Sequence, residues 1–425
     1  MTTVKYIIFD FDGTLVDTTP LIVATMQAAI SELDLPPKSY RECKSSIGLR
    51  LEDIPAALWP DHPEARILYP QTYRRIFDEK KGALQAKAFP GVIETLHCLH
   101  ADGYRLAIAS SRSHKSLTDY VALFGIADLF DAIVGGDDVS NGKPAPDPVL
   151  AICGKLGWDT AESLVVGDTC FDIEMGHNAG TQTCAVSYGN QTRGELRPSH
   201  PNAVINSFAA IIPLLKGVSQ DAIGYVEENI IPRYAAFDKA HREDHVRMVI
   251  GQSLHLAGKM HGLDPDLVYL TAAFHDLGLI NGRENHHIDS ASILASDPFI
   301  TARFTPEQIK LMAEAAEDHR ASGKSKPRSD YGLIVAEADR FIDAETIVRR
   351  TIQYGLANYP ELDREGHFRR TLDHLKDKYG PQGYLKIWIP WSDNARRLSH
   401  LHKIIADSDR LKEIFNRIFD EETSL

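Results

Sequence analysis

The chain has 425 residues, which at about 150 residues per domain is enough for two or three domains. Apolar residues make up 43% and charged residues 25%, which is typical of folded globular proteins and excludes a mainly disordered chain. With 46 basic and 59 acidic residues, the formal net charge is −13, which argues against broad charge-driven binding to nucleic acid or to an anionic membrane.

The cysteines and the N-terminus both favour a cytoplasmic protein. The five cysteines are scattered and include no Cys-x-x-Cys pair, so they form neither a disulfide framework nor a zinc-finger pattern, and a reducing compartment fits them. The first residues, MTTVKYIIFDFDGT, contain one short apolar run that is broken by acids. Such a run is neither a signal peptide nor a membrane span.

The first half of the chain alternates short apolar strands with helices. Polar residues or glycines end each predicted strand, and helical periodicity fills the gaps, for example at 92–102 and 148–157. This alternation predicts an α/β domain with a Rossmann-like parallel sheet wrapped by helices on both faces, whose site lies at the carboxyl ends of the strands. The predicted strands are 4–8, 105–110, 131–136, 163–168 and 182–189.

Residues 18–88 interrupt the alternation with helical spacing and no strand signal, which predicts a helical insertion after the first strand. The segment 88–92 returns the chain to the sheet, and an amphipathic helix at 208–216 ends the first domain, before a hinge at 217–219. Beyond the hinge the strand signal disappears, and residues 222–425 are expected to form an all-α domain. Its predicted helices are 242–261, 265–276, 288–296, 306–317, 330–355, 365–379 and 394–420.

Acids, a serine and a lysine follow the predicted strands in chain order. Asp10 and Asp12 end the first strand, where one carboxylate can attack a phosphorus atom while the other handles the proton. Ser110 can donate a hydrogen bond to a phosphoryl oxygen, and Lys143 can neutralise the charge of the attacked phosphate. The carboxylates that a hard cation such as Mg²⁺ would need are supplied by a later segment, at Asp168 and Asp172.

Taken together, these motifs resemble the haloacid dehalogenase superfamily, in the subfamily of phosphoglycolate phosphatase and β-phosphoglucomutase. The resemblance covers residues 1–216 and includes FDFDGTLVDT, FPGV, LAIASS, GKPAPDP and GDTCFD. It implies a core made of residues 1–17 and 89–216, with a helical cap at 18–88.

The resemblance also implies a role for each motif. Asp10 is the nucleophile that forms an aspartyl-phosphate, and Asp12 is first the general acid and then the base. Ser110 and Lys143 hold the phosphoryl group. The implied ligands of Mg²⁺ are the carboxylate of Asp10, the backbone carbonyl of Asp12, Asp168 and, as a supporting acid, Asp172.

An acid at position 12 favours hydrolysis of a phosphomonoester, because it can protonate an alcohol leaving group. The family's dehalogenases lack an acid there and its transport ATPases carry threonine. A sugar phosphomutase remains an alternative. The predicted substrate-binding residues are Thr14, Arg50 and Ser111. Arg50 falls where relatives place a specificity loop, and its alternative role is that of a solvated arginine at a helix start.

Histidines and acids concentrate in the second half of the chain. His275 and Asp276 follow the apolar run LVYLTAAF within a predicted helix, where two polar groups are costly to bury unless they are paired or bound to a metal. Asp339 likewise follows LIVAEA, and His245 precedes the apolar helix VRMVIGQSLHLA. Imidazole and carboxylate groups from several helices can form a site for a divalent metal, which lowers the pKa of a bound water and polarises a phosphoryl oxygen.

This pattern resembles the HD-domain metal-dependent phosphohydrolases over about residues 235–345. The implied ligands are His245, His275, Asp276 and Asp339. His241 is an alternative to His245, which is preferred because Val249 and Ser253 continue its helical face.

A second metal would need two further histidines, which some members of that superfamily have. His286 and His319 fall in the right interval, and His287 is an alternative to His286. We therefore expect one or two divalent ions, of Mn, Fe, Ni, Co or Zn. The candidate cations for an anionic substrate are Arg283, Arg320, Arg328 and Arg340.

The sequence thus predicts a bifunctional phosphohydrolase. The first half would hydrolyse a small phosphomonoester with Mg²⁺, and the second half would be a metal-dependent hydrolase of a phosphoester, with a nucleotide as one candidate. The partners expected are small phosphorylated metabolites or nucleotides, with no membrane and no strong sign of nucleic-acid binding. One alternative makes the HD half a regulatory nucleotide sensor without turnover, and a complete ligand set argues against it.

Overall fold

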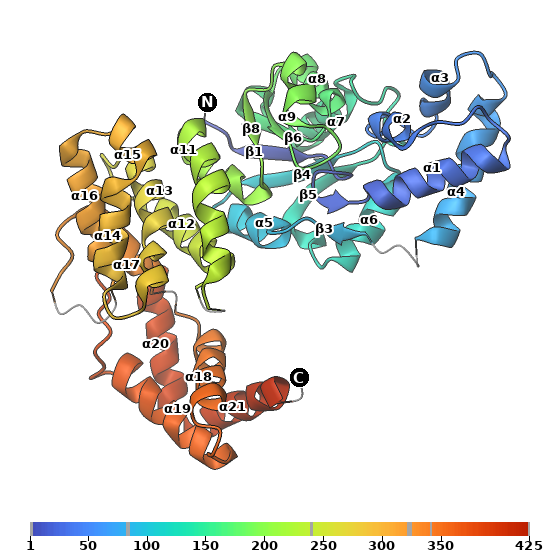
Figure 1. The fold of residues 1–425 in the computed structure, drawn as a ribbon. Coiled ribbons are helices and arrows are strands. Elements are labelled where there is room, and N and C mark those ends of the chain that lie inside the picture. Colours follow the sequence, from blue (N-terminus) through green and yellow to red (C-terminus); the bar gives the residue numbers. More distant parts are fainter. Residues whose placement is uncertain (1–2, 82–85, 239–240, 321–324, 341, 424–425) are drawn as a thin grey trace. The chain divides into compact units, whose positions relative to one another are not determined.

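The chain divides into two units, Met1–Glu227 and Glu228–Leu425 (Figure 1). The computed structural model describes residues 3–81, 86–238, 241–320, 325–340 and 342–423. The division falls after the hinge that we predict at 217–219 and after the predicted end of the first domain at residue 216. Among the described residues, no helix combines the length and the apolar character needed to cross a bilayer.

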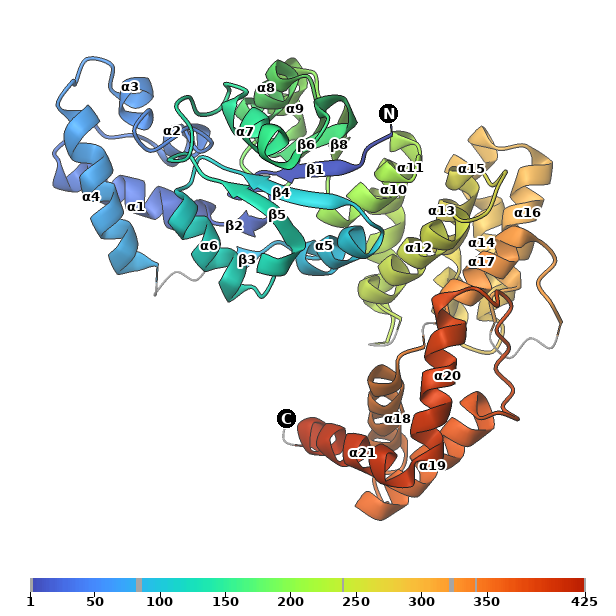
Figure 2. The same cartoon turned by 180° about the vertical axis from the view of Figure 1, so that it is seen from behind.

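The first unit is built on a six-stranded parallel sheet with the strand order β5-β4-β1-β6-β7-β8. Helices α7 and α8 cover one face and α5 and α6 the other, so the predicted α/β architecture is confirmed (Figures 1 and 2). The strands are β1 (Tyr6–Phe9), β4 (Arg105–Ala109), β5 (Phe130–Val134), β6 (Ser163–Gly167), β7 (Gln182–Val186) and β8 (Ala203–Ile205). The helices around them are α5 (Val92–Ala101), α6 (His114–Leu123), α7 (Asp147–Leu156), α8 (Cys170–Ala179), α9 (Arg193–Leu196), α10 (Ile211–Leu215) and α11 (Gln220–Tyr225).

The central strand β1 has apolar side chains on both faces, which is why its sequence is a continuous apolar run rather than an alternating one. Ile8 is paired with Ala107 on one side and with Val165 on the other, and all three pack into one core with α7 and α8. The sixth strand, β8, has only three residues and gave no strand signal in the sequence.

The helical insertion is confirmed as a cap with its own apolar core. A two-stranded antiparallel ribbon of β2 (Val16–Asp17) and β3 (Lys87–Ala88) connects it to the sheet. Trp59 and Tyr69 are buried at its centre, where their rings lie 5.3 Å apart. The cap helices are α1 (Thr19–Glu32), α2 (Tyr40–Ser45), α3 (Ile54–Leu58) and α4 (Ala65–Lys80).

The second unit is helical, as predicted. The helices of its first part are α12 (Glu243–Ala257), α13 (Pro265–Phe274), α14 (His286–Ser296), α15 (Pro298–Arg303), α16 (Pro306–Glu317) and α17 (Asp330–Ala338). The predicted helix 265–276 extends too far, because α13 ends at Phe274 and a 3₁₀ turn follows at Leu277–Asn281. Gly278 allows this turn to lie against α14, since a Cβ there would be 2.0 Å from the carbonyl oxygen of His286.

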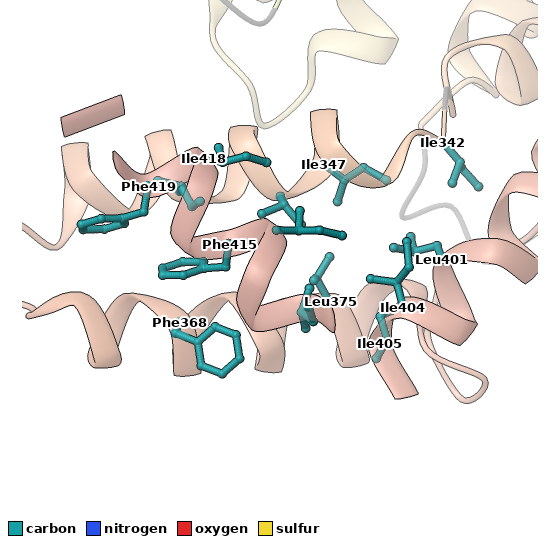
Figure 3. Packing of buried hydrophobic residues seen from close by; sticks show 14 of the residues in the cluster. Ile342, Ile347, Phe368, Leu375, Leu401, Ile404, Ile405, Phe415, Ile418 and Phe419 are labelled. Atoms are coloured by element: carbon teal, nitrogen blue, oxygen red, sulfur yellow. The ribbon is translucent and has the colours of Figure 1, made fainter. Parts of the chain in front are cut away.

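The last four helices form what we call the C-terminal lobe, residues 344–423. They are α18 (Ala344–Asn358), α19 (Arg364–Tyr379), α20 (Asp393–Ala406) and α21 (Ser408–Thr423). Their apolar faces meet in one core, in which Phe368, Leu375 and Phe415 are buried together (Figure 3). This lobe lies beyond the region, about 235–345, in which the sequence suggested a metal site.

Two of the predicted helices are each two helices in the structure. The predicted helix 330–355 breaks between α17 and α18, where the side chain of Asp343 accepts a hydrogen bond from the backbone N–H of Thr346, at 2.8 Å. The predicted helix 394–420 breaks at Asp407, whose carboxylate accepts from the backbone N–H of Arg410, at 3.0 Å. In both places an aspartate caps a new helix N-terminus while the apolar periodicity continues through the break.

Candidate active sites

The strand register brings the predicted acids of the first unit together. Phe9 is opposite both Ile108 and Val166, so the residues that follow these positions reach the same edge of the sheet. At this edge lie Asp10, Ser110 and Asp168, and all three are buried. The predicted assembly of side chains at the carboxyl ends of the strands is therefore present.

Lys143 lies between two buried acids, Asp10 and Asp172. Its Nζ donates to Asp10 Oδ1 and, at 2.6 Å, to Asp172 Oδ1. Burial raises the pKa of Asp10 to about 7, although Lys143 opposes this shift. Burial would lower the pKa of Lys143, but the charges of Asp10 and Asp172 outweigh it and raise that pKa. Lys143 is therefore a permanent cation beside the predicted nucleophile.

The carboxylates of Asp10, Asp168 and Asp172 form a cluster in which one oxygen of each lies within 4.8 Å of the others. Asp168 accepts hydrogen bonds from the Thr14 hydroxyl, at 3.1 Å, and from the backbone N–H of Asn190, at 2.5 Å. Burial and the two neighbouring acids still raise its pKa well above the ordinary value. Three buried carboxylates this close together are a donor set that fits a hard divalent cation such as Mg²⁺.

Asp12 faces a different cation, Arg112, which our sequence analysis did not single out. Arg112 Nη2 lies 2.6 Å from Asp12 Oδ1 and Nε lies 3.0 Å from Oδ2, and Thr18 Oγ1 donates to Oδ1 at 2.6 Å. The guanidinium also stacks on rings of the core and of the cap, at 5.1 Å from Tyr120 and 5.3 Å from Phe77. The sequence contains one signal for Arg112, because it is a basic residue two positions after Ser110, in the run SSRS.

A cavity of about 820 Å³ separates the cap from the sheet edge, and Asp10, Asp12, Ser110 and Ser111 all line it. The Ser111 hydroxyl donates to the carbonyl of Gly48 in the cap, at 2.6 Å. Two other predicted substrate-binding residues do not line the cavity. Thr14 is fully buried against Asp168, and Arg50 is bound to Asp53 at 2.7 Å and to the carbonyl of Ser140 at 2.8 Å.

The second unit brings six histidines and acids together from five places in the helical fold. Two groups have ligand atoms within 4.8 Å of one another. One is His245, His275 and Asp339, and the other is Asp276, His286 and His319. All of these are residues that the sequence singled out.

Asp276 links the two groups, because its two carboxylate oxygens face different sides. Oδ2 lies 3.3 Å from His275 Nε2 and 3.5 Å from His245 Nε2. Oδ1 lies 3.4 Å from His319 Nε2 and 3.7 Å from His286 Nε2. This is the arrangement of a carboxylate that can bridge two cations.

The backbone orients three of the imidazoles. The Nδ1 atoms of His275, His286 and His319 each contact the carbonyl oxygen three residues earlier, at 2.8 Å, 2.8 Å and 2.5 Å respectively. A ring that donates its Nδ1–H to a carbonyl keeps the lone pair on Nε2, which suits a metal ligand. The buried Nε2 atom of His275 has no hydrogen-bond partner among the described residues, and the same is true of His245.

The two alternative ligands lie outside both groups. His241 Nδ1 lies 2.8 Å from Asp238 Oδ1, and its Nε2 lies 3.0 Å from Arg283 Nη2. His287 is adjacent to His286 but belongs to neither group. The geometry therefore favours His245 over His241 and His286 over His287.

The charge of His245 is set by the acids beside it. Burial alone would lower the pKa of His245, but the carboxylates of Asp276 and Asp339 outweigh this effect and raise the pKa to about 9.

Of the four candidate arginines, only Arg320 lines the cavity next to these ligands, which has a volume of about 210 Å³. Arg283 contacts His241. Arg328 is paired with Glu317 and Asp318, and Arg340 is buried and donates to the carbonyl of Ala336.

Comparison with known proteins matches two different families to the two parts of the chain that carry these sites. The family model described as haloacid dehalogenase-like hydrolase matches residues 7–186, and the model of the HD domain matches residues 242–343. The protein named "Probable phosphatase IndB", from Dickeya dadantii, is 32% identical over 48% of this chain and 91% of its own length. A phosphoglycolate phosphatase of Haemophilus influenzae is 29% identical over 50% of this chain and 98% of its own length. The crystal structure of a predicted phosphoglycolate phosphatase from Haemophilus somnus has 30% identity and a TM-score of 0.45, and the match covers 50% of this chain and 99% of that one.

Proposed function

Because the chain belongs to the haloacid dehalogenase-like hydrolases and also carries an HD domain, it is a hydrolase of phosphoric esters, and we propose that each half has its own phosphohydrolase site. The first site would act on a small phosphomonoester through an aspartyl-phosphate. The second would be a metal-dependent hydrolase of a phosphoester. The observation that carries the first proposal is the cluster of Asp10, Asp168 and Asp172, in which Asp10 and Asp172 are also paired with Lys143.

In the first step the carboxylate of Asp10 attacks the phosphorus atom and the bond to the leaving alcohol breaks. Asp12 donates a proton to the departing oxygen, so a neutral alcohol leaves. Asp12 then takes a proton from a water molecule, whose oxygen attacks the aspartyl-phosphate, releasing inorganic phosphate and regenerating Asp10. Ser110 and Lys143 hold the phosphoryl oxygens throughout. Mg²⁺, bound by Asp10, Asp168 and the carbonyl of Asp12, would supply charge stabilisation.

The test of the first site is the substitution Asp10→Asn in the full chain, in a background that carries His275→Ala so that the second site is silent. We expect turnover of para-nitrophenyl phosphate and of phosphoglycolate to fall by at least about 10³-fold, because the amide cannot form the covalent intermediate. Asp17→Asn is a matched control, since Asp17 lies in the same segment but is exposed. Substantial activity in Asp10→Asn would falsify the nucleophile assignment.

The second proposal is carried by the two oxygens of Asp276, which face two different sets of histidines. Two divalent ions would fit these donors, and when bound they would activate a water and polarise the phosphoryl group. The chain's own contribution is to hold Asp276 between the two sets and to fix the imidazole tautomers through backbone carbonyls.

The number of metals decides between a four-ligand and a six-ligand site. In the full chain carrying Asp10→Asn, we expect elemental analysis to give two transition-metal ions per chain, and anomalous scattering to place one of them against His319. His319→Ala should remove one ion, whereas His287→Ala, the matched control, should leave both. A single ion that does not contact His319, under metal-replete conditions, would contradict the two-metal site and leave the ligands His245, His275, Asp276 and Asp339.

A further inference from the structure

The cavity of the HD site has one wall that lies outside the HD domain. The ligands Asp276, His286, His319 and Asp339 line it together with His241, Arg320 and Tyr384. Tyr384 lies between α19 and α20 in the C-terminal lobe, well beyond residue 343, where the match to the HD family ends. The C-terminal lobe therefore contributes a side chain to a cavity whose other lining residues all lie between His241 and Asp339.

The backbone around Tyr384 is held from the side of the lobe. The N–H of Tyr384 donates to the carbonyl of Asp377, at 3.1 Å, and the N–H of Leu385 donates to the carbonyl of Lys378, at 3.0 Å. The next side chain, Leu385, is buried in the core of the lobe. These contacts fix the position of Tyr384 relative to the end of α19.

The same segment is also tied to the helix that carries a metal ligand. Glu337 lies on α17, two positions before Asp339, and is fully buried. Its carboxylate accepts hydrogen bonds from the N–H of Trp388, at 3.1 Å, and from the hydroxyl of Ser392, at 2.6 Å. The connection that carries Tyr384 is therefore bonded to α17, the helix that ends at Asp339.

Tyr384 and Arg320 are both available to a ligand. Tyr384 is 52% exposed, and its side chain makes no hydrogen bond or ring contact with another described residue. Arg320 donates to the carbonyl of Glu284, at 2.8 Å, and no described carboxylate is paired with it. The cavity thus presents an unpaired cation beside the metal ligands and an aromatic ring at its edge.

The size of the cavity indicates what Tyr384 would contact. A volume of about 210 Å³ is below the roughly 300–1,000 Å³ of pockets that enclose a whole drug-sized ligand. A phosphoryl group fits inside beside Arg320, but a nucleoside does not. The organic group of a larger phosphoester must therefore extend out of the cavity through its opening, where the half-exposed Tyr384 lies.

We propose that the C-terminal lobe completes the substrate site of the HD half and that Tyr384 is a specificity-determining residue, which stacks on the heteroaromatic ring of a nucleotide-like phosphoester. Arg320 binds the phosphoryl group of the same ligand. The inference rests on the proposed function of the HD half. It adds that the contact with Tyr384 distinguishes a phosphoester that carries a ring from a small one. Stacking of a base on an aromatic side chain contributes to affinity, and we expect its loss to weaken binding about tenfold, which corresponds to about 1.4 kcal/mol.

The test measures binding to the metal-loaded full chain that carries Asp10→Asn, by titration with two probes, inorganic phosphate and adenosine 5′-monophosphate. Binding that is lost when His275→Ala is added belongs to the HD site. We expect Tyr384→Ala to weaken binding of the nucleotide about tenfold, without changing the affinity for phosphate or the metal content. Tyr384→Phe keeps the ring and should bind both probes as the parent does. Trp391→Ala is the matched control, because Trp391 is 50% exposed on the same connection but does not line the cavity.

Each outcome separates the two proposals. If the parent binds no phosphate at the HD site, the proposed function is wrong and this inference falls with it. If phosphate binds and Tyr384→Ala binds the nucleotide as tightly as the parent, Tyr384 does not determine specificity. If Tyr384→Ala weakens both probes equally or loses metal, Tyr384 has only a structural role and the inference is overturned.

Discussion

Asp10 and Asp12 are two positions apart, and each faces its own buried cation. Lys143 contacts Asp10, whereas Arg112 contacts Asp12. This separation allows each acid to be changed without removing the cation of the other. It also suggests separate tests for the two acids.

The affinity of the first site for Mg²⁺ should depend on pH. Burial raises the pKa of Asp10 to about 7, so its carboxyl holds a proton that the cation must displace. In the His275→Ala background we expect Mg²⁺ to bind about tenfold more weakly at pH 6 than at pH 8, and calorimetry in buffers of different ionisation enthalpy should detect the released proton. Asp10→Asn should abolish this proton release. An affinity that is the same at both pH values would contradict the prediction.

The same shift predicts how the stability of the metal-free chain changes with pH. The pKa of Asp10 is higher in the folded chain than its ordinary value of 3.8, so between about pH 4 and 7 the folded chain binds more protons than the unfolded chain. The contribution of Asp10 to the free energy of unfolding should therefore fall as the pH rises through this window. Urea denaturation in the presence of a chelator measures it, and Asp10→Asn should make the dependence weaker.

The pair of Arg112 and Asp12 should be strongly coupled. The side chain of Arg112 is 8% exposed and that of Asp12 is 14% exposed, so removing either one leaves a poorly hydrated charge without its partner. We expect Arg112→Met to lower the free energy of unfolding by about 3 kcal/mol. Adding Asp12→Asn should cost much less than its effect in the parent, with a coupling of about 1–3 kcal/mol in a double-mutant cycle. Additive effects of the two substitutions on the free energy of unfolding would mean that the interaction between Arg112 and Asp12 does not contribute to stability.

Sequence reasoning identified residues that follow strand ends and missed those that act across the fold. Asp10, Ser110 and Asp168 could be grouped because each follows an apolar run. Arg112 could not be assigned in this way, since its partner Asp12 lies 100 residues earlier and their contact depends on how the segments after β1 and β4 meet. The choice between His286 and His287 likewise depended on which ring faces Asp276, and two adjacent positions in a chain do not reveal this.

At the scale of helices, periodicity located the elements but not their ends. The apolar pattern of α17 continues past Asp339, yet the helix ends there because Asp343 caps the next helix. The break is functional in our proposal, since it frees Asp339 to face the histidines and leaves room for the C-terminal lobe to bond to Glu337. A capping aspartate marks where the new helix begins, but in the sequence it cannot be distinguished from an ordinary polar residue on a helix surface.

Glu337 should be needed to hold the connection between α19 and α20. Glu337→Ala leaves the part-buried N–H of Trp388 and the buried hydroxyl of Ser392 without an acceptor, at about 1–3 kcal/mol for each group. We expect the free energy of unfolding to fall by about 3 kcal/mol and hydrogen exchange to accelerate in residues 386–394. Glu337→Gln keeps one acceptor oxygen and should lose less than half as much. Unchanged exchange in Glu337→Ala would show that the connection is held by other contacts.

At the scale of the whole chain, the first unit extends beyond the predicted boundary at residue 216. The side chain of Gln220, on α11, accepts from the backbone N–H of Val204 at 3.3 Å and donates to the carbonyl of Asn202 at 3.2 Å. These bonds tie α11 to the edge strand β8, which was too short to be seen in the sequence. A fragment that ends at residue 216 lacks this contact, so it should be less stable than one that ends at residue 227.

The two units should also unfold separately, because each has its own buried apolar core. We expect heat denaturation of the full chain to show two transitions. A ligand at about 100 times its dissociation constant stabilises the folded state by about 2.7 kcal/mol, which for units of this size corresponds to a rise of roughly 5–10 °C. Mg²⁺ should raise one transition and a transition metal such as Mn²⁺ the other. Asp168→Asn should abolish only the first shift and His275→Ala only the second. Fragments 1–227 and 228–425 should each reproduce one transition, whereas a single transition that both variants affect alike would show that the two units unfold as one.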